Sequence, residues 1–89
     1  MVTKDILLDT NAYSAFKRNV AEAVVIVQQA PLINLSSVVL GELLGGFALG
    51  TRETFNRQEL QQFLTSPRVE VLTINEHTAQ WYARRFIPI

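Results

Sequence analysis

The sequence contains no cysteine and only one histidine. Disulfide bonds, thiolate metal sites and a cysteine nucleophile are therefore excluded. His77 has no second histidine or cysteine in the chain with which to share a metal ion. We therefore interpret His77 as an ordinary solvated or packed side chain.

An excess of charge of either sign is absent as well, because eight basic and eight acidic residues give a formal net charge of zero. This balance argues against a general nucleic-acid-binding protein, although an enzyme that meets nucleic acid locally is still compatible with it. The N-terminal residues do not form a basic segment followed by an apolar signal sequence. The one long uncharged stretch is interrupted by Glu42 and several glycines. We expect a cytoplasmic protein with no membrane segment.

What the sequence does contain is apolar residues, at 48% of its 89 positions. This length predicts one small domain spanning residues 1–89. A chain this short buries only about 60% of the surface that its unfolded form exposes. We therefore expect some apolar surface to remain for a partner chain to cover.

Apolar runs and helical patterns alternate along the chain. The pattern predicts strands over 4–8, 32–35 and 68–72, and helices over 12–18, 20–30, 35–49, 52–64 and 79–86. Residues 19–22 resemble a capping box for the second helix, and Ser36 and Ser37 are positioned to cap the third. This order predicts an α/β fold in which a small parallel sheet is flanked by helices.

Asp9 directly follows the first predicted strand, as part of the polar cluster Asp9, Thr10 and Asn11. Ligands of open α/β sheets bind at the carboxyl ends of the strands, so Asp9 is a candidate site residue. A second interpretation is equally open on position alone. Aspartate is among the best residues for capping a helix N-terminus, and Asp9 also precedes a predicted helix.

Glu42 is the only ionisable side chain between Ala23 and Thr51. The helix predicted around it is apolar on nearly every side, which is typical of a buried helix. A lone buried carboxylate must be neutral, paired or bound to a cation. We expect Glu42 to be buried and to form an acidic site with Asp9, or alternatively to pair with an arginine. Glycines at 41, 45 and 46 suggest close approach of another backbone or a ligand to this helix.

Residues 7–11 (LLDTN) and 36–43 (SSVVLGEL) resemble the two N-terminal motifs of PIN-domain ribonucleases, especially the VapC toxins of VapBC toxin–antitoxin modules. The resemblance implies a three-layer PIN-like fold and a metal-dependent endoribonuclease activity. It makes Asp9 and Glu42 ligands of Mg²⁺ or Mn²⁺, and Asn11 a third catalytic residue that helps orient the site, with Ser37 as another polar neighbour. Such hard cations take oxygen ligands and keep several waters.

The chain departs from this family at its C-terminal end, because no acidic residue follows Glu76. The family places two further carboxylates in a segment resembling Thr-Asn-Asp-x-x-Ile-Ala-Ala, which this sequence lacks. The resemblance therefore implies a partial PIN-like domain without its C-terminal strand and helix, and weak or absent hydrolysis. RNA, an antitoxin protein and a second copy of the chain are the implied partners. The alternative is an inactive remnant that acts only through dimerisation or antitoxin binding. A purely structural α/β domain is the third interpretation.

Overall fold

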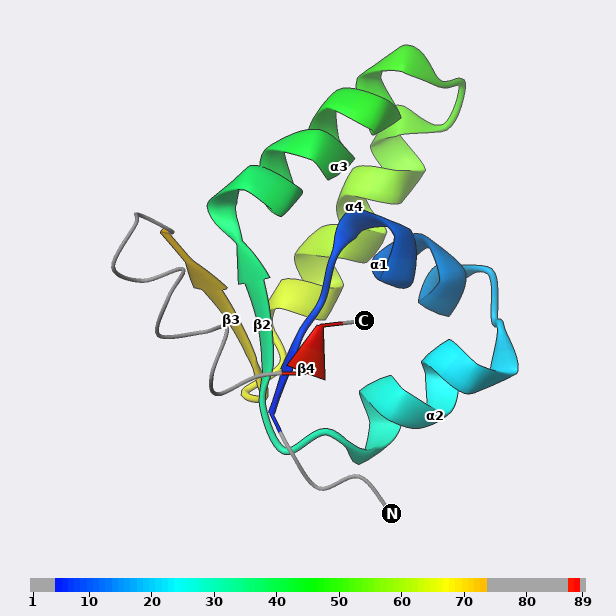
Figure 1. Ribbon diagram of the computed structural model, residues 1–89. Coiled ribbons are helices and arrows are strands. Elements are labelled where there is room, and N and C mark those ends of the chain that lie inside the picture. Colours follow the sequence, from blue (N-terminus) through cyan, green and yellow to red (C-terminus); the bar gives the residue numbers. More distant parts are fainter. Residues whose placement is uncertain (1–4, 74–86, 89) are drawn as a thin grey trace.

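A computed structural model of the chain describes residues 5–73 and 87–88 and shows a small α/β fold (Figure 1). Its sheet contains β1 (Ile6–Leu7), β2 (Ile33–Ser36), β3 (Val69–Leu72) and β4 (Ile87–Pro88). The strand order is β3-β2-β1-β4, and each neighbouring pair is parallel. The parallel sheet predicted from the sequence is therefore confirmed. The pairing of β4 with β1 was not predicted, and Pro88 fits there because β4 is an edge strand.

Helices form both connections between the first three strands. α1 (Thr10–Lys17) and α2 (Ala21–Gln29) join β1 to β2, whereas α3 (Ser37–Leu49) and α4 (Glu53–Leu64) join β2 to β3. These elements match the predicted ones over 4–72 to within a few residues. The helix predicted over 79–86 lies outside the described residues. In the part of the chain that the structure describes, no helix has the length and apolar character needed to cross a membrane.

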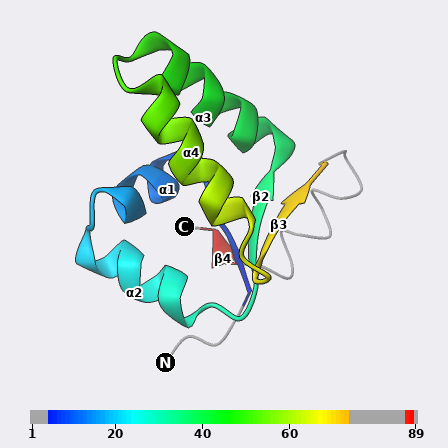
Figure 2. The same ribbon diagram turned by 180° about the vertical axis from the view of Figure 1, so that it is seen from behind.

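The core forms on one face of the sheet. Ile6, Ile33 and Val69 occupy matching register positions on that face, and each is buried. Helices α1 to α4 supply the other side of this core, with Tyr13, Val27, Leu43 and Leu60. Figure 2 shows α4 beside α3 on this side of the molecule. Of the three layers expected, the described residues therefore form the sheet and one helical layer.

The helix cap predicted at the start of α3 is confirmed, and the one predicted at the start of α2 is wrong. The Ser36 hydroxyl accepts the Val39 N–H at 3.1 Å at the start of α3, and Gly50 ends that helix. The capping box predicted over 19–22 does not form, because Val20 is the N-cap of α2 and its side chain makes no capping hydrogen bond. Asn19 instead adopts a φ of 63° in the turn between α1 and α2. Asparagine tolerates this left-handed conformation better than most residues do.

The expectation that α3 is a buried helix is wrong. Leu43 is its only buried residue, whereas Val38 is 63% exposed and Leu49 is 92% exposed. A Cβ atom added at Gly41, Gly45 or Gly46 would meet nothing within 4 Å, so the close approach expected at these glycines is absent from the described part of the chain. The apolar pattern indicates that burial of α3 is favourable, but it does not show whether this chain covers each face of the helix.

One arginine ties α2 to the sheet. Arg68, just before β3, donates from Nη1 to the carbonyl oxygens of Val27 at 3.1 Å and Ala30 at 2.5 Å. The Val27 carbonyl would normally accept the N–H of residue 31, but that residue is Pro31, which has none. The Arg68 guanidinium therefore takes the place of a helical hydrogen bond.

Candidate functional site

The candidate site lies where the two central strands end. The Leu8 N–H donates to the Asn34 carbonyl at 2.8 Å, so the pairing of β1 with β2 continues to the residue before Asp9. Asp9 then caps α1, because its Oδ1 atom accepts the Ala12 N–H at 2.7 Å. The capping interpretation of Asp9 is thus confirmed. It leaves Oδ2 without a hydrogen bond from the described residues, so capping does not exclude a second role.

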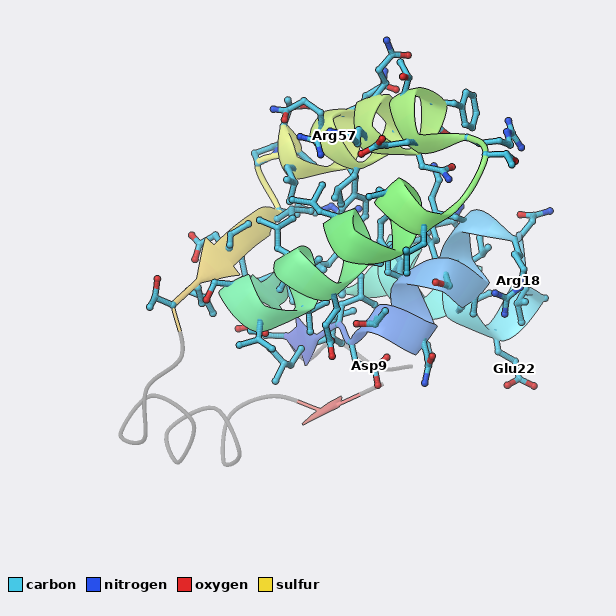
Figure 3. The ribbon with its side chains drawn as sticks, turned by 90° about the horizontal axis from the view of Figure 1, so that it is seen from above. Asp9, Arg18, Glu22 and Arg57 are labelled. Carbon is cyan, nitrogen blue, oxygen red and sulfur yellow. The ribbon has the colours of Figure 1, made fainter. Side chains whose placement is uncertain are left out.

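Glu42 reaches this edge from the second turn of α3. The Thr10 hydroxyl donates to Glu42 Oε1 at 2.7 Å, although the two residues are 32 positions apart in the sequence. Because Thr10 directly follows Asp9, this hydrogen bond brings the predicted acidic residues to the same edge of the sheet. Figure 3 shows Asp9 at the start of α1, next to the sheet edge.

The environment of Glu42 differs from the expected one. Glu42 is exposed, as is Asp9, so neither carboxylate needs a cation or an arginine to offset burial. The physical reason is the one-sided packing of α3, whose Leu43 faces the core while Glu42 faces solvent. Ion pairs in the described residues involve Glu53 and Glu59 and leave Glu42 out.

The polar neighbours expected at the site lie on the same two helices. Asn11 belongs to the first turn of α1 and Ser37 is the first residue of α3. Both residues are exposed, and the described part of the chain gives neither side chain a hydrogen bond. Their polar groups are therefore available to a ligand at this edge.

The donor atoms of Asp9 and Glu42 are carboxylate oxygens on two exposed residues, and hard cations that keep most of their water shell take ligands of this type. No cluster of three or more histidine, cysteine, aspartate or glutamate side chains that could hold a metal exists within the described ranges 5–73 and 87–88. Among the described residues, this edge therefore presents two carboxylates and not the three or four protein ligands that a Zn²⁺ site uses.

The sequence did not identify Thr10, which directly follows Asp9 and donates a hydrogen bond to Glu42. Its position between Asp9 and Asn11 was visible, but its partner could not be identified without the packing of α1 against α3. Of the acidic residues that follow α4, Glu70 lies on β3 and is exposed, and Glu76 lies outside the described residues.

Comparison with solved structures shows that the chain has a known fold. The chain is similar to a chain in the crystal structure of VapBC2 from Rickettsia felis bound to a DNA fragment from their promoter, with a TM-score of 0.64 and 22% sequence identity. This chain shares its fold with that VapBC2 chain. The similarity covers 90% of this chain but only 62% of the other. No protein-family model matches the sequence, and no curated protein matches it.

Proposed function

We propose that this chain is a toxin-type component of a VapBC-like module. Its site would be the metal-dependent endoribonuclease site of a PIN domain with fewer acidic residues. The observation that supports the proposal is the hydrogen bond from Thr10 to Glu42, which links Glu42 to the residue next to Asp9 at the carboxyl end of the parallel strands. The shared fold with a VapBC2 chain supports it as well.

In this proposal Asp9 and Glu42 hold the cation, Thr10 fixes the orientation of Glu42, and Asn11 donates from its amide to a substrate phosphate. Asp9 is oriented by the Ala12 N–H, which occupies one of its oxygens. When bound, Mg²⁺ or Mn²⁺ would polarise a phosphodiester of RNA and lower the pKa of an attacking water. Two carboxylates fix a cation less firmly than a larger acidic set, so we expect slow cleavage.

The test is cleavage of single-stranded RNA by the purified chain in Mg²⁺, in Mn²⁺ and in EDTA. We expect slow, cation-dependent cleavage that Asp9→Asn and Glu42→Gln each reduce at least about tenfold, since both substitutions remove a charged ligand. Asparagine is as good an N-cap as aspartate, so Asp9→Asn should keep the stability of α1. The exposed Glu22, at the far end of the helical layer in Figure 3, provides the matched control Glu22→Gln.

Cleavage that persists in EDTA, or that is equal in all three variants, would refute the nuclease proposal. Asp9→Ala adds a check on the fold, because it removes the cap and should cost about 1 kcal/mol of stability. If Asp9→Asn loses activity without losing stability, the carboxylate acts through its charge and not through the helix.

A second candidate function is association without catalysis, and the exposed face of α3 favours it. The apolar side chains of Val38 and Leu49 are exposed on α3, and an added Cβ atom would meet nothing at its three glycines. A face of this kind suits a second copy of the chain or an antitoxin. Sedimentation as a stable monomer that binds no antitoxin-like partner, combined with RNA cleavage, would exclude this function in favour of the first.

A further inference from the structure

A separate pocket opens at the other end of α1. It encloses about 520 Å³ between α1, the end of α3 and the first half of α4. Asp9 begins α1 and Arg18 follows its last turn, and Figure 3 shows the two residues at opposite ends of the helix. The pocket is therefore distinct from the acidic edge formed by Asp9 and Glu42.

Basic side chains gather in this pocket on a chain with no net charge. Lys17, Arg18 and Arg52 line it, with Glu59 as the only acidic residue. Lys17 is paired with Glu59 at 2.8 Å. Neither Arg18 nor Arg52 has a carboxylate partner in the part of the chain that the structure describes, so the described lining of the pocket has more positive than negative charge.

Tyr13, one of the residues that line this pocket, has a buried hydroxyl group without a partner among the described residues. Tyr13 lines it and is only 2% exposed, and its phenolic oxygen makes no hydrogen bond with the described residues. Its ring packs edge-to-face on Phe63 at 5.3 Å between centroids, which holds the phenol in place. A buried polar group without a hydrogen bond is costly, so this donor is suited to an acceptor supplied by a ligand.

The lining indicates what kind of ligand supplies that acceptor. Phe47 and Phe55 provide apolar surface, and the Arg52 guanidinium lies 4.2 Å from the Phe55 ring centroid. A carboxylate can accept from a phenol and from an arginine at once, and arginine pairs with carboxylates through two parallel hydrogen bonds. RNA fits less well, because a nucleic-acid site needs a charged groove that follows the backbone, whereas these cations surround one hollow.

We propose that this pocket binds a carboxylate side chain of a partner protein, flanked by apolar residues, with the Tyr13 hydroxyl, Arg18 and Arg52 as donors. The proposal rests on the proposed function as a component of a VapBC-like module, adds a contact surface to the exposed face of α3, and does not require Asp9 or Glu42 to be catalytic. It assigns the partner an acidic and apolar contact segment and places that segment across α1 and α4.

The test uses a defined probe, the peptide acetyl-Glu-Leu-Glu-Phe-amide, titrated into the intact chain and followed by amide chemical shifts. We expect binding with a dissociation constant on the order of 1 mM, typical of a short fragment. The matched peptide acetyl-Gln-Leu-Gln-Phe-amide should bind about tenfold more weakly, because it lacks the charge. A short oligouridylate serves as the nucleic-acid probe.

Three variants connect the binding to the pocket. Tyr13→Phe keeps the ring against Phe63 and should weaken acidic-peptide binding several-fold, and Arg52→Gln should weaken it about tenfold. Arg57→Gln is the control, because Arg57 is also on α4 but does not line this pocket. Binding by both peptides alike, no effect of Tyr13→Phe and Arg52→Gln, or stronger binding of the oligouridylate would each overturn the proposal. RNA cleavage by Tyr13→Phe is expected at the wild-type rate. Loss of peptide binding in this variant can therefore be judged independently of the nuclease proposal.

Discussion

Replacement of Arg68 by methionine tests how the helical layer is attached to the sheet. The substitution keeps most of the apolar stem and removes the guanidinium that donates to Val27 and Ala30. Both acceptor residues are buried, at 3% and 2% exposure, so their carbonyl oxygens gain little access to water in the variant. The proline at position 31 leaves the Val27 carbonyl without its usual helical donor.

The expected cost follows from these contacts. A hydrogen bond to a charged group contributes about 1.5–3 kcal/mol, and a buried acceptor without a partner costs a similar amount. Because one guanidinium nitrogen serves both carbonyls, we expect Arg68→Met to lower the free energy of unfolding by about 2–4 kcal/mol. A domain of this size has a total stability of roughly 4–13 kcal/mol, so the loss is large. Each kcal/mol corresponds to about 4–8 °C in melting temperature.

Urea denaturation followed by circular dichroism measures the loss, and hydrogen exchange locates it. Amide protection should fall first in the last turn of α2. Arg57→Met is the control, because the 3.8 Å pair of Arg57 with Glu53 is exposed and should contribute below about 0.5 kcal/mol. An Arg68→Met variant within about 0.5 kcal/mol of wild type would refute the role given to Arg68.

Two further predictions concern single positions on α1 and α3. Burial, with a smaller contribution from the charge of Glu59, raises the pKa of Tyr13 to about 12. Because the folded-state pKa lies above the unfolded one, the associated stability is complete below about pH 10 and is lost as the pH rises through about 12. Urea denaturation at pH 9 to 12 should therefore show wild type losing on the order of 2–3 kcal/mol relative to Tyr13→Phe, and parallel curves would contradict this. At Gly46 of α3, where an added Cβ meets nothing, Gly46→Ala should stabilise the monomer by about 0.5–1 kcal/mol. If the α3 face binds a second copy, analytical ultracentrifugation should show weaker association of Gly46→Ala, and unchanged association would remove α3 from the interface.

The position of the acidic edge was predictable because it depends on local pattern and strand order. A short apolar strand followed by a capping residue places Asp9 at the carboxyl end of β1, and Ser36 marks the start of α3 in the same way. Parallel strands bring both points to one edge of the sheet. The contact between Thr10 and Glu42 was not predictable, since it depends on how α1 packs against α3.

The errors have equally specific causes. The apolar composition of α3 favours its burial, but it cannot show that this chain leaves Val38 and Leu49 exposed. The Asn19 pattern was read as a cap, although asparagine also favours the left-handed turn that it adopts here. Arg68 gave no sequence signal at all, because its acceptors are 38 and 41 residues away.

The cap made by Asp9 has a consequence for how descendants of this fold should vary. A lineage that lost metal binding altogether would still lose stability on replacing Asp9 with alanine, so aspartate, asparagine, serine or threonine would persist there for structural reasons. Glu42 has no comparable restraint among the described residues, because its side chain makes a single hydrogen bond there, a solvent-exposed one with the Thr10 hydroxyl. Retention of glutamate at position 42 is therefore the better indicator of a working acidic site, and an aspartate at position 9 says little on its own.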